Sequence, residues 1–279
     1  MTIRRMKFTA LKYVALAGLA ALSLTPLATS ASAQAWAARH GMTGAQYQAE
    51  FNKYTSQGYR LTDVSGYKIS GKMFYAAIWS KSGGGAWVAR HGMSSGNYQS
   101  AFDGYTGKGY APLLVDADAS NFAAIWAKTR GTWVTRHGLS SSGYQAEFDK
   151  WVGKGYRLVD VTGYAQGGKA RYAAIWKKVG GGAWVARHGM TAAKYQAEFN
   201  KWTARGYKPA HVDGYKVGGT VYYAAIWTKG GGAYVARHGL SGAQYQAEFT
   251  KWTGKGYRLH DVSGYDGGGS ARYAAIWYK

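Results

Sequence analysis

The chain has 279 residues, with 35 Lys plus Arg against 13 Asp plus Glu, and it contains no cysteine. The lack of cysteine excludes disulfides, thiol catalysis and thiolate metal sites, so we expect packing alone to hold the fold. The formal net charge of +22 predicts attraction to polyanions such as phosphate-bearing envelope polymers, acidic polysaccharides or nucleic acid.

Residues 1–33 have the features of a cleavable export signal. Four basic residues precede an apolar run over residues 13–24, and the segment ends with Ala31-Ser32-Ala33. We therefore expect cleavage before Gln34 and secretion to the periplasm or the outside of the cell. The apolar run is shorter than the ~20 residues of a membrane-spanning helix, so no span is predicted. Without this segment, which carries no acid, the net charge becomes +18.

The rest of the chain is a tandem repeat. The tripeptide Arg-His-Gly recurs with its arginine at Arg39, Arg90, Arg136, Arg187 and Arg237. A repeat of about 50 residues indicates one structural unit used several times. We predict a single domain over residues 34–279, preceded by the signal peptide at 1–33. Its units run over about 35–84, 86–131, 132–181, 183–231 and 233–279.

Each unit should contain one helix. In the last unit, Ser241 is followed three residues later by Gln, which is typical of a capping box at a helix start. Tyr245, Phe249 and Trp252 then form one apolar stripe at helical spacing. Gly256 is well placed to end the helix in a left-handed conformation.

Strands account for the remainder of each unit. Residues 257–262 and 271–278 flank a turn of three glycines, which predicts a β-hairpin. The second strand of this hairpin is apolar on both faces, so we expect it to be central in a sheet. A further strand, such as 86–92, opens each unit. The fold class is therefore α+β, with five units of strand-helix-strand-strand. Because one unit cannot cover its own apolar surface, we expect the units to stack into a curved or closed antiparallel sheet with helices on one side.

The second unit departs from the others. It is shorter and has Ala101 where the other units carry Glu, and it ends its first hairpin strand at Val115-Asp116-Ala117-Asp118 without the second Gly-Tyr. We expect a tighter hairpin turn there and the loss of any site built from that turn.

The ordered motifs Trp-x-x-Arg-His-Gly-Met/Leu, Tyr-Gln-x-x-Phe, Gly-Tyr and Tyr-Ala-Ala-Ile-Trp resemble a bacterial tandem repeat family that accompanies secreted β-lactamase-like serine hydrolases. They are also similar to the repeats of the amino-terminal domain of fungal polyglycine hydrolases. The resemblance covers residues 35–279. In those proteins the nucleophile belongs to a separate hydrolase domain, so the resemblance implies an accessory part and a possible serine hydrolase partner.

The repeated histidines could be general bases or metal ligands. A base needs an orienting partner, and the candidates Asp63, Asp160 and Asp261 are replaced by Leu114 and His211 in the other units. An obligatory His-Asp pair is therefore not expected, and we interpret the histidines as bonded to the strand-to-helix corner. The arginines are interpreted as stacked on an aromatic ring or bonded to carbonyls. Arg-His-Gly also opens the histidine-phosphatase motif, but the Arg and Pro that continue it are absent.

Exposed tyrosines beside the turn glycines could add stacking platforms. No catalytic residue, metal or cofactor is expected. The predicted binding positions are repeated ones: Arg39, His40, Arg90, His91, Arg136, His137, Arg187, His188, Arg237 and His238, with Tyr67, Tyr164, Tyr215 and Tyr265.

A catalytic constellation repeated in every unit would be unusual, whereas a repeated shallow site gives avidity. The sequence therefore favours a secreted, non-catalytic, multivalent binding or structural module that engages an anionic or peptide-containing cell-envelope polymer. The alternative is a hydrolase or a hydrolase-associated accessory protein. A nucleic-acid binder, with retention that falls steeply with salt, is a third reading.

Overall fold

The computed structural model describes residues 35–119 and 121–279. Residues Gln34–Lys279 form one compact unit. The predicted signal peptide lies outside the described residues and stays a prediction. Five modules follow one another, and we number them 1 to 5 over residues 36–80, 87–127, 133–177, 184–229 and 234–278.

Each module has the order strand, helix, strand, strand, as the sequence predicts. Module 1 consists of β1 (Trp36–Thr43), α1 (Gly44–Ser56), β2 (Arg60–Ile69) and β3 (Lys72–Ser80). Module 2 consists of β4 (Trp87–Met93), α2 (Ser95–Gly107), β5 (Ala111–Asp118) and β6 (Asn121–Ala127). Module 3 consists of β7 (Trp133–Leu139), α3 (Ser141–Gly153), β8 (Arg157–Gln166) and β9 (Lys169–Lys177).

The last two modules repeat this order. Module 4 consists of β10 (Trp184–Thr191), α4 (Ala192–Thr203), β11 (Tyr207–Val217) and β12 (Thr220–Lys229). Module 5 consists of β13 (Tyr234–Ser241), α5 (Gly242–Gly254), β14 (Arg258–Asp266) and β15 (Ala271–Tyr278).

The helices begin and end where their capping residues stand. Ser241 caps α5, and its hydroxyl and the Gln244 side chain satisfy backbone donors reciprocally, so the predicted capping box is confirmed. The same box occurs at Thr43 before α1. Gly256 has φ +80° just beyond the end of α5, a conformation that glycine adopts without a steric penalty.

Each module forms its own three-stranded antiparallel sheet with the last strand in the middle, in the order β1-β3-β2 for module 1. The predicted central position of the last strand is confirmed. The prediction of one curved or closed sheet is wrong, because the structure has five separate sheets in its described part. Neighbouring sheets meet at their inner strands, where side chains of one module accept backbone N–H groups of the preceding module in place of a backbone ladder.

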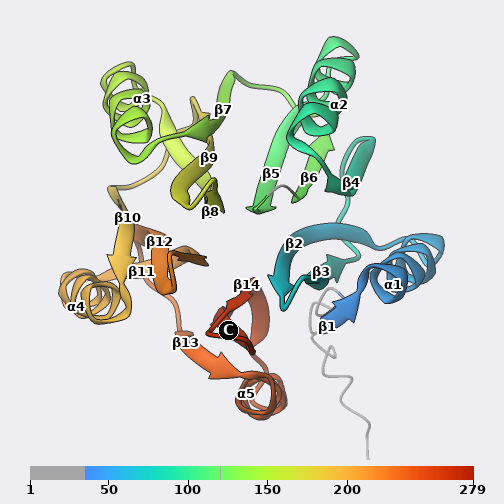
Figure 1. Cartoon of the computed structure of the whole chain (residues 1–279), viewed down its shortest axis with the longest axis vertical. Helices are drawn as coiled ribbons and strands as arrows, with labels where there is room; N and C mark the ends of the chain where they lie inside the picture. The colour runs from blue at the N-terminus through green and yellow to red at the C-terminus, as the bar shows by residue number, and fades with distance from the viewer. Residues whose placement is uncertain (1–34, 120) are drawn as a thin grey trace, which may run out of the picture. The chain divides into compact units, whose positions relative to one another are not determined.

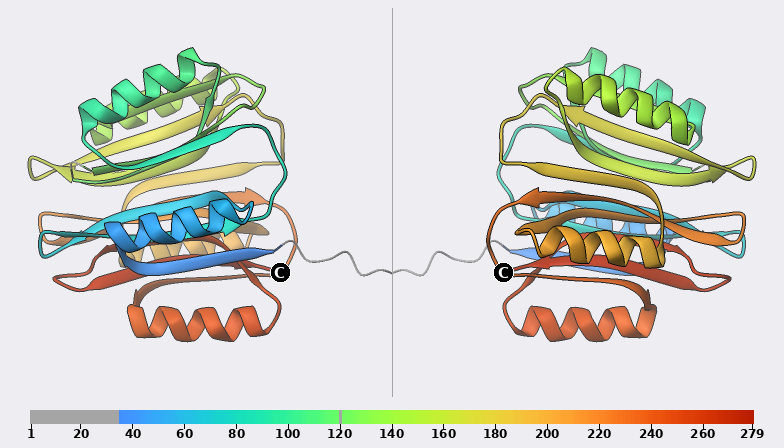
Figure 2. Two further views of the ribbon diagram at one scale, coloured as in Figure 1. Left: turned by 90° about the vertical axis from the view of Figure 1, so that its right-hand side faces the viewer. Right: turned by 90° about the vertical axis from the view of Figure 1, so that its left-hand side faces the viewer.

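The five modules close a ring. The inner strand β2 contacts β5, and the sequence of contacts continues through β8 and β11 to β14, which contacts β2. Figure 1 shows these strands at the centre and the helices on the outside. In Figure 2 the hairpin turns lie at one end of the modules and the linkers between modules at the other. Because every module has two neighbours, no terminal repeat is left to be capped.

The hydrophobic core consists of five clusters, each shared by two neighbours. The cluster between modules 1 and 2 joins Tyr47 of α1 and Trp79 of β3 to Ala89 and Ile125 of the next module. An equivalent cluster around Trp277 joins module 5 to module 1. The central-strand tryptophans are fully buried, and burying 150–250 Å² of such a ring contributes at most roughly 4–6 kcal/mol. The predicted need for neighbours is confirmed.

Candidate functional site

The Arg-His-Gly tripeptide lies where the first strand of each module approaches its helix. In module 1 the pairing of β1 with β3 shifts register between Arg39 and Met42, which marks a bulge. Gly41 has φ +65° there, and its N–H donates to the Tyr67 hydroxyl at 3.2 Å. The Gly and the Tyr of the repeat are therefore two halves of one structural contact.

The prediction that the turn-side tyrosines are exposed is wrong. Tyr67, Tyr164, Tyr215 and Tyr265 are between 1% and 4% exposed. They pack against the preceding module, and the Tyr67 hydroxyl, for example, is 2.6 Å from the hydroxyl of Tyr273 in module 5. The four tyrosine side chains face a neighbouring module and not solvent, because the neighbouring modules cover both faces of each sheet. None of these tyrosines therefore offers a stacking surface.

Each repeated histidine packs into the preceding module. The five rings lie 4.5–5.0 Å, centroid to centroid, from the helix tyrosine of that module in edge-on contacts. His40 thereby contacts Tyr245 of module 5 across the ring closure. Burial lowers the pKa of all five imidazoles and so favours their neutral form. Among these five repeated histidines, all of them within the described residues, His188 alone has a hydrogen bond through its ring, to Ser141 Oγ at 3.1 Å.

The repeated arginines turn to their own module. Each donates from one terminal nitrogen to the carbonyl of the preceding residue at 2.8–2.9 Å. In four modules the Nε also lies 3.1–3.4 Å from a helix glutamate, as in Arg187 with Glu198. The guanidinium groups lie over an aromatic ring of the helix, which confirms the interpretation from sequence. In module 2, where Ala101 replaces the glutamate, Arg90 has no carboxylate partner among the described residues.

Grooves run along the boundaries between modules, where a helix faces the first strand of the next module. They have volumes of about 170 Å³ between α1 and β4, 330 Å³ between α3 and β10, and 550 Å³ between α4 and β13. All three are lined by a Tyr-Gln-x-x-Phe face on one side and Ala-Arg-His or its equivalent on the other. The lining residues of the middle groove are Tyr144, Gln145, Phe148, Ala186, Arg187 and His188. The structure thus brings the predicted Arg and His positions together with helix residues of another module.

The predicted orienting aspartates lie away from these grooves, on the inner strands. Five buried carboxylates each accept a backbone N–H from the preceding module at 2.6–2.9 Å. We call them the axial carboxylates: Asp63, Asp116, Asp160, Asp213 and Asp261. Their donors, in the same order, are the N–H groups of Val262, Gly66, Val115, Gly163 and Val212. The first of these bonds closes the ring between modules 5 and 1.

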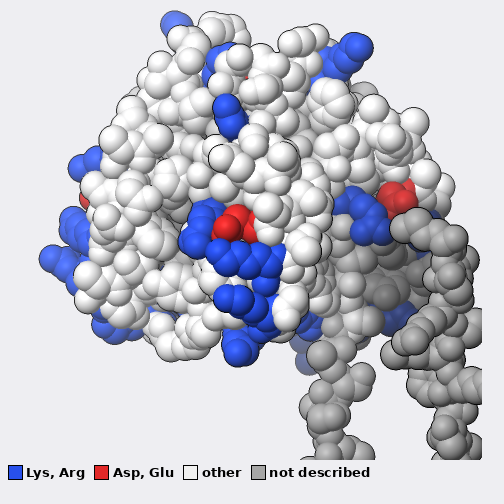
Figure 3. Space-filling model, turned by 90° about the horizontal axis from the view of Figure 1, so that it is seen from below, with Lys and Arg blue, Asp and Glu red and all other residues white. Residues whose placement is uncertain are grey.

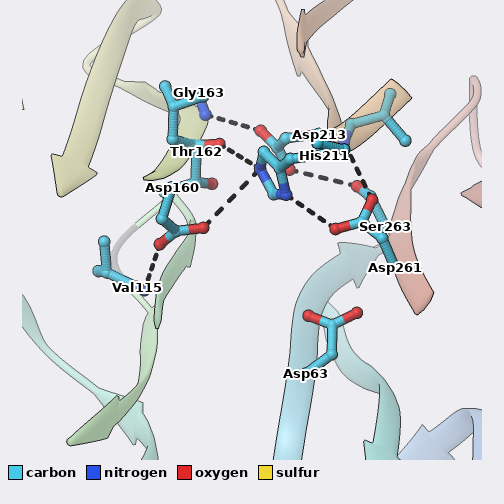
Figure 4. A network of polar contacts seen from close by, with 12 residues as sticks. Asp63, Val115, Asp160, Thr162, Gly163, His211, Asp213, Asp261 and Ser263 are labelled. Carbon is cyan, nitrogen blue, oxygen red and sulfur yellow. Dashed lines mark hydrogen bonds and ion pairs between the residues drawn. The ribbon is translucent and has the colours of Figure 1, made fainter. Parts of the chain in front are cut away.

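His211 is the cation of this axial network (Figure 4). Its Nδ1 is 2.8 Å from Asp261 Oδ1 and its Nε2 is 2.8 Å from the Val161 carbonyl oxygen. Burial alone lowers the pKa of His211, but the Asp261 carboxylate outweighs it, so the pKa lies well above its ordinary value. Burial raises the pKa of Asp160 to about 6 and that of Asp213 to about 7. Sequence reasoning missed this role, because substitution of Asp by His at one position in the repeat gives no sign of where the side chain points.

Basic side chains dominate the outer surface. On the face shown in Figure 3, Lys and Arg gather around few acidic residues. In module 5 the Lys251 and Lys255 ammonium groups each lie 5.1 Å from the centroid of the Trp252 ring. The Trp252 Nε1 donates to Glu248 at 2.7 Å. The C-terminal end of α5 is therefore a cationic surface in which two lysines lie beside a tryptophan ring.

Within the described residues, no helix has the length and apolar character needed to span a membrane. Residues 35–119 and 121–279 also contain no group of three or more His, Asp or Glu side chains arranged to hold a metal ion.

Comparison with known proteins identifies the repeat. No curated protein matches the sequence. A family model described as a polyglycine hydrolase-like structural repeat matches five consecutive segments, residues 33–82, 84–129, 130–179, 181–230 and 231–279. The matched segments cover more than half of the chain and confirm the resemblance seen in its motifs. The chain therefore belongs to the polyglycine hydrolase-like structural repeat family.

Proposed function

We propose that the chain is a secreted, non-catalytic, multivalent binding module whose grooves between modules engage an anionic or peptide-containing cell-envelope polymer. The observation that carries this proposal is the recurrence of one groove, with the same residue types, at three module boundaries. Repetition around a ring presents equivalent weak sites to one long ligand, which raises its apparent affinity without a deep pocket.

The groove chemistry fits such a ligand. Arg187 supplies a half-exposed guanidinium, Gln145 an exposed amide, and Phe148 an aromatic surface. These groups suit carboxylates, phosphates and peptide bonds better than purely apolar molecules. The net charge of +18 after the predicted signal peptide attracts the polymer over a longer range. A serine hydrolase acting on the same polymer would be the catalytic companion of such a module.

The test is stepwise removal of groove arginines. Deleting a module would open the ring, so point substitutions replace deletions. The series begins with Arg187→Gln and continues with Arg90→Gln and Arg237→Gln in the other two grooves. It is matched by Lys→Gln substitutions outside the grooves, starting with Lys72 and Lys169. Retention is measured on immobilised anionic envelope polymer, peptide polymer, neutral glycan and DNA at two salt concentrations.

We expect retention on an envelope polymer to fall with each arginine removed and to change much less in the lysine series. Equal losses in the two series would show that net charge alone causes retention and would overturn the groove proposal. Retention on DNA alone, with a steep fall as salt increases, would favour a nucleic-acid binder instead.

A further inference from the structure

A second kind of cavity lies at the hairpin end of the inner strands. It has a volume of about 320 Å³ and is lined by residues of β2, β5, β11 and β14 and of the turn after β2. Unlike the grooves, it is lined by residues of four modules, which contribute different side chains to it. Its volume is near the lower end of the range for small-molecule sites, about 300–1,000 Å³.

Charges of both signs alternate around this cavity. Near their hairpin ends the inner strands of modules 1, 2, 4 and 5 carry Lys68, Asp118, Lys216 and Asp266, and all four residues line the cavity. Lys216 Nζ pairs with Asp266 at 2.9 Å across one module boundary. Asp118 accepts the backbone N–H of Lys68 across another. The Lys68 ammonium group itself has no ion-pair partner among the described residues.

The buried lining also holds an incompletely bonded carboxylate. Asp116 is 8% exposed, and its Oδ2 accepts the Gly66 N–H at 2.6 Å. Its Oδ1 has no hydrogen-bond partner among the described residues. Asp213, by contrast, uses both oxygens, on the Gly163 N–H and the Ser263 hydroxyl. This oxygen keeps some contact with solvent at the cavity, so a ligand that brings a donor can bond to it.

We propose that this cavity binds a small zwitterion, an amino acid or a short amino-acid-like molecule with one ammonium and one carboxylate group. The ammonium group would lie between Asp116 and Asp118, and the ligand carboxylate would pair with the ammonium group of Lys68. Burial raises the pKa of Asp116 and Asp118, and a ligand ammonium group beside them would favour their charged forms. Lys216 and Asp266, in contrast, already neutralise each other. The site is independent of the grooves, which lie on the helix side of the modules.

The experiment uses 4-aminobutyrate as the probe and isothermal titration calorimetry on the protein. Butylamine and butyrate, which carry one charge each, are the comparison ligands. We expect 4-aminobutyrate to bind at least about tenfold more tightly than either. No binding of the zwitterion, or equal binding of a singly charged ligand, would overturn the proposal.

Two variants locate the site. Lys68→Gln and Asp118→Asn should each weaken 4-aminobutyrate binding about tenfold or more. The nearby Lys72→Gln, which does not line the cavity, should leave binding unchanged, as should Arg187→Gln in a groove. Thermal unfolding of every variant confirms that the fold is retained. Loss of binding in Lys72→Gln equal to that in Lys68→Gln would refute the assigned position of the ligand.

Discussion

Substitution of Gly264 by alanine should destabilise the boundary between modules 5 and 1. Gly264 lies in β14 directly against the Tyr67 ring of module 1. An alanine Cβ there would lie 2.9 Å from Tyr67 Cζ and nearer still to two other ring carbons. Unstrained carbon contacts lie at about 3.5–4.0 Å, so the ring or the strand would have to move by more than about 1 Å.

The Tyr67 ring has little freedom to make this movement. Its hydroxyl is held by the Gly41 N–H at 3.2 Å and by the Tyr273 hydroxyl at 2.6 Å. Overpacking of this kind costs about 1–3 kcal/mol, and more when hydrogen bonds break as well. For a domain of this size, each kcal/mol lowers the melting temperature by about 2–4 °C, so we expect a decrease of about 2–12 °C.

The measurement is thermal and urea unfolding of Gly264→Ala beside a matched glycine. Gly254→Ala is the control, because its Cβ at the end of α5 would meet no atom within 4 Å. The control should be neutral or slightly more stable, since alanine favours a helix by up to about 1 kcal/mol over glycine. If Gly264→Ala is as stable as Gly254→Ala, then modules 5 and 1 are not in contact and the reasoning fails.

Three further predictions concern single residues. The pKa of Asp213 is about 7 in the folded protein, so the folded state holds this proton more tightly than the unfolded chain does. The protonated Asp213 therefore contributes fully to stability below about pH 4, and its contribution is lost as the pH rises through about 7. Urea unfolding between pH 4 and 8 should therefore show wild-type stability falling relative to Asp213→Asn by on the order of 4 kcal/mol, and a pH-independent difference would contradict this pKa. Ser241→Ala should cost about 1 kcal/mol of unfolding free energy through loss of the α5 cap, and no loss would mean that the hydroxyl is not needed there. Ala101→Glu should add an ion pair with Arg90 and raise the free energy of unfolding by about 0.2–1 kcal/mol at low salt, and high salt should remove this gain. No gain at low salt would show that the pair does not form.

Local patterns were sufficient to predict the interior of each module. The apolar stripe that includes Tyr245 and the capping Ser241 define α5, because helix periodicity and capping depend on near neighbours in the chain. The two apolar faces of the strand around Trp277 placed it at the centre of its sheet, because only a strand covered on both sides can bury both faces.

Contacts between modules could not be predicted from these patterns. Tyr265 follows a glycine and precedes a turn, which is typical of an exposed residue, yet it is buried against Tyr223 of module 4. Its burial depends on the angle at which neighbouring sheets meet, and no local signal encodes that angle. For the same reason the sequence could not show that His188 contacts Tyr144 in another module.

The polar residues of the inner strands explain why separate sheets replaced the predicted continuous one. Asp63 accepts the Val262 N–H and Ser65 accepts the Gly264 N–H, so edge donors that a neighbouring strand would otherwise pair with are already satisfied. Asp and Ser at alternate positions of a strand normally indicate a solvent-exposed edge. Here these residues point into a buried boundary, where they stabilise the contact between modules.

Closure of the ring is tested most directly by hydrogen exchange at the Val262 and Gly264 amides, measured residue by residue by NMR. Both N–H groups point away from their own sheet, to Asp63 and Ser65 of module 1. A closed ring predicts slow exchange, comparable to that of the Val212 amide, which makes the equivalent bond to Asp261 between modules 4 and 5. Rapid exchange at Val262 and Gly264 with slow exchange at Val212 would show an open row of modules and would contradict this account.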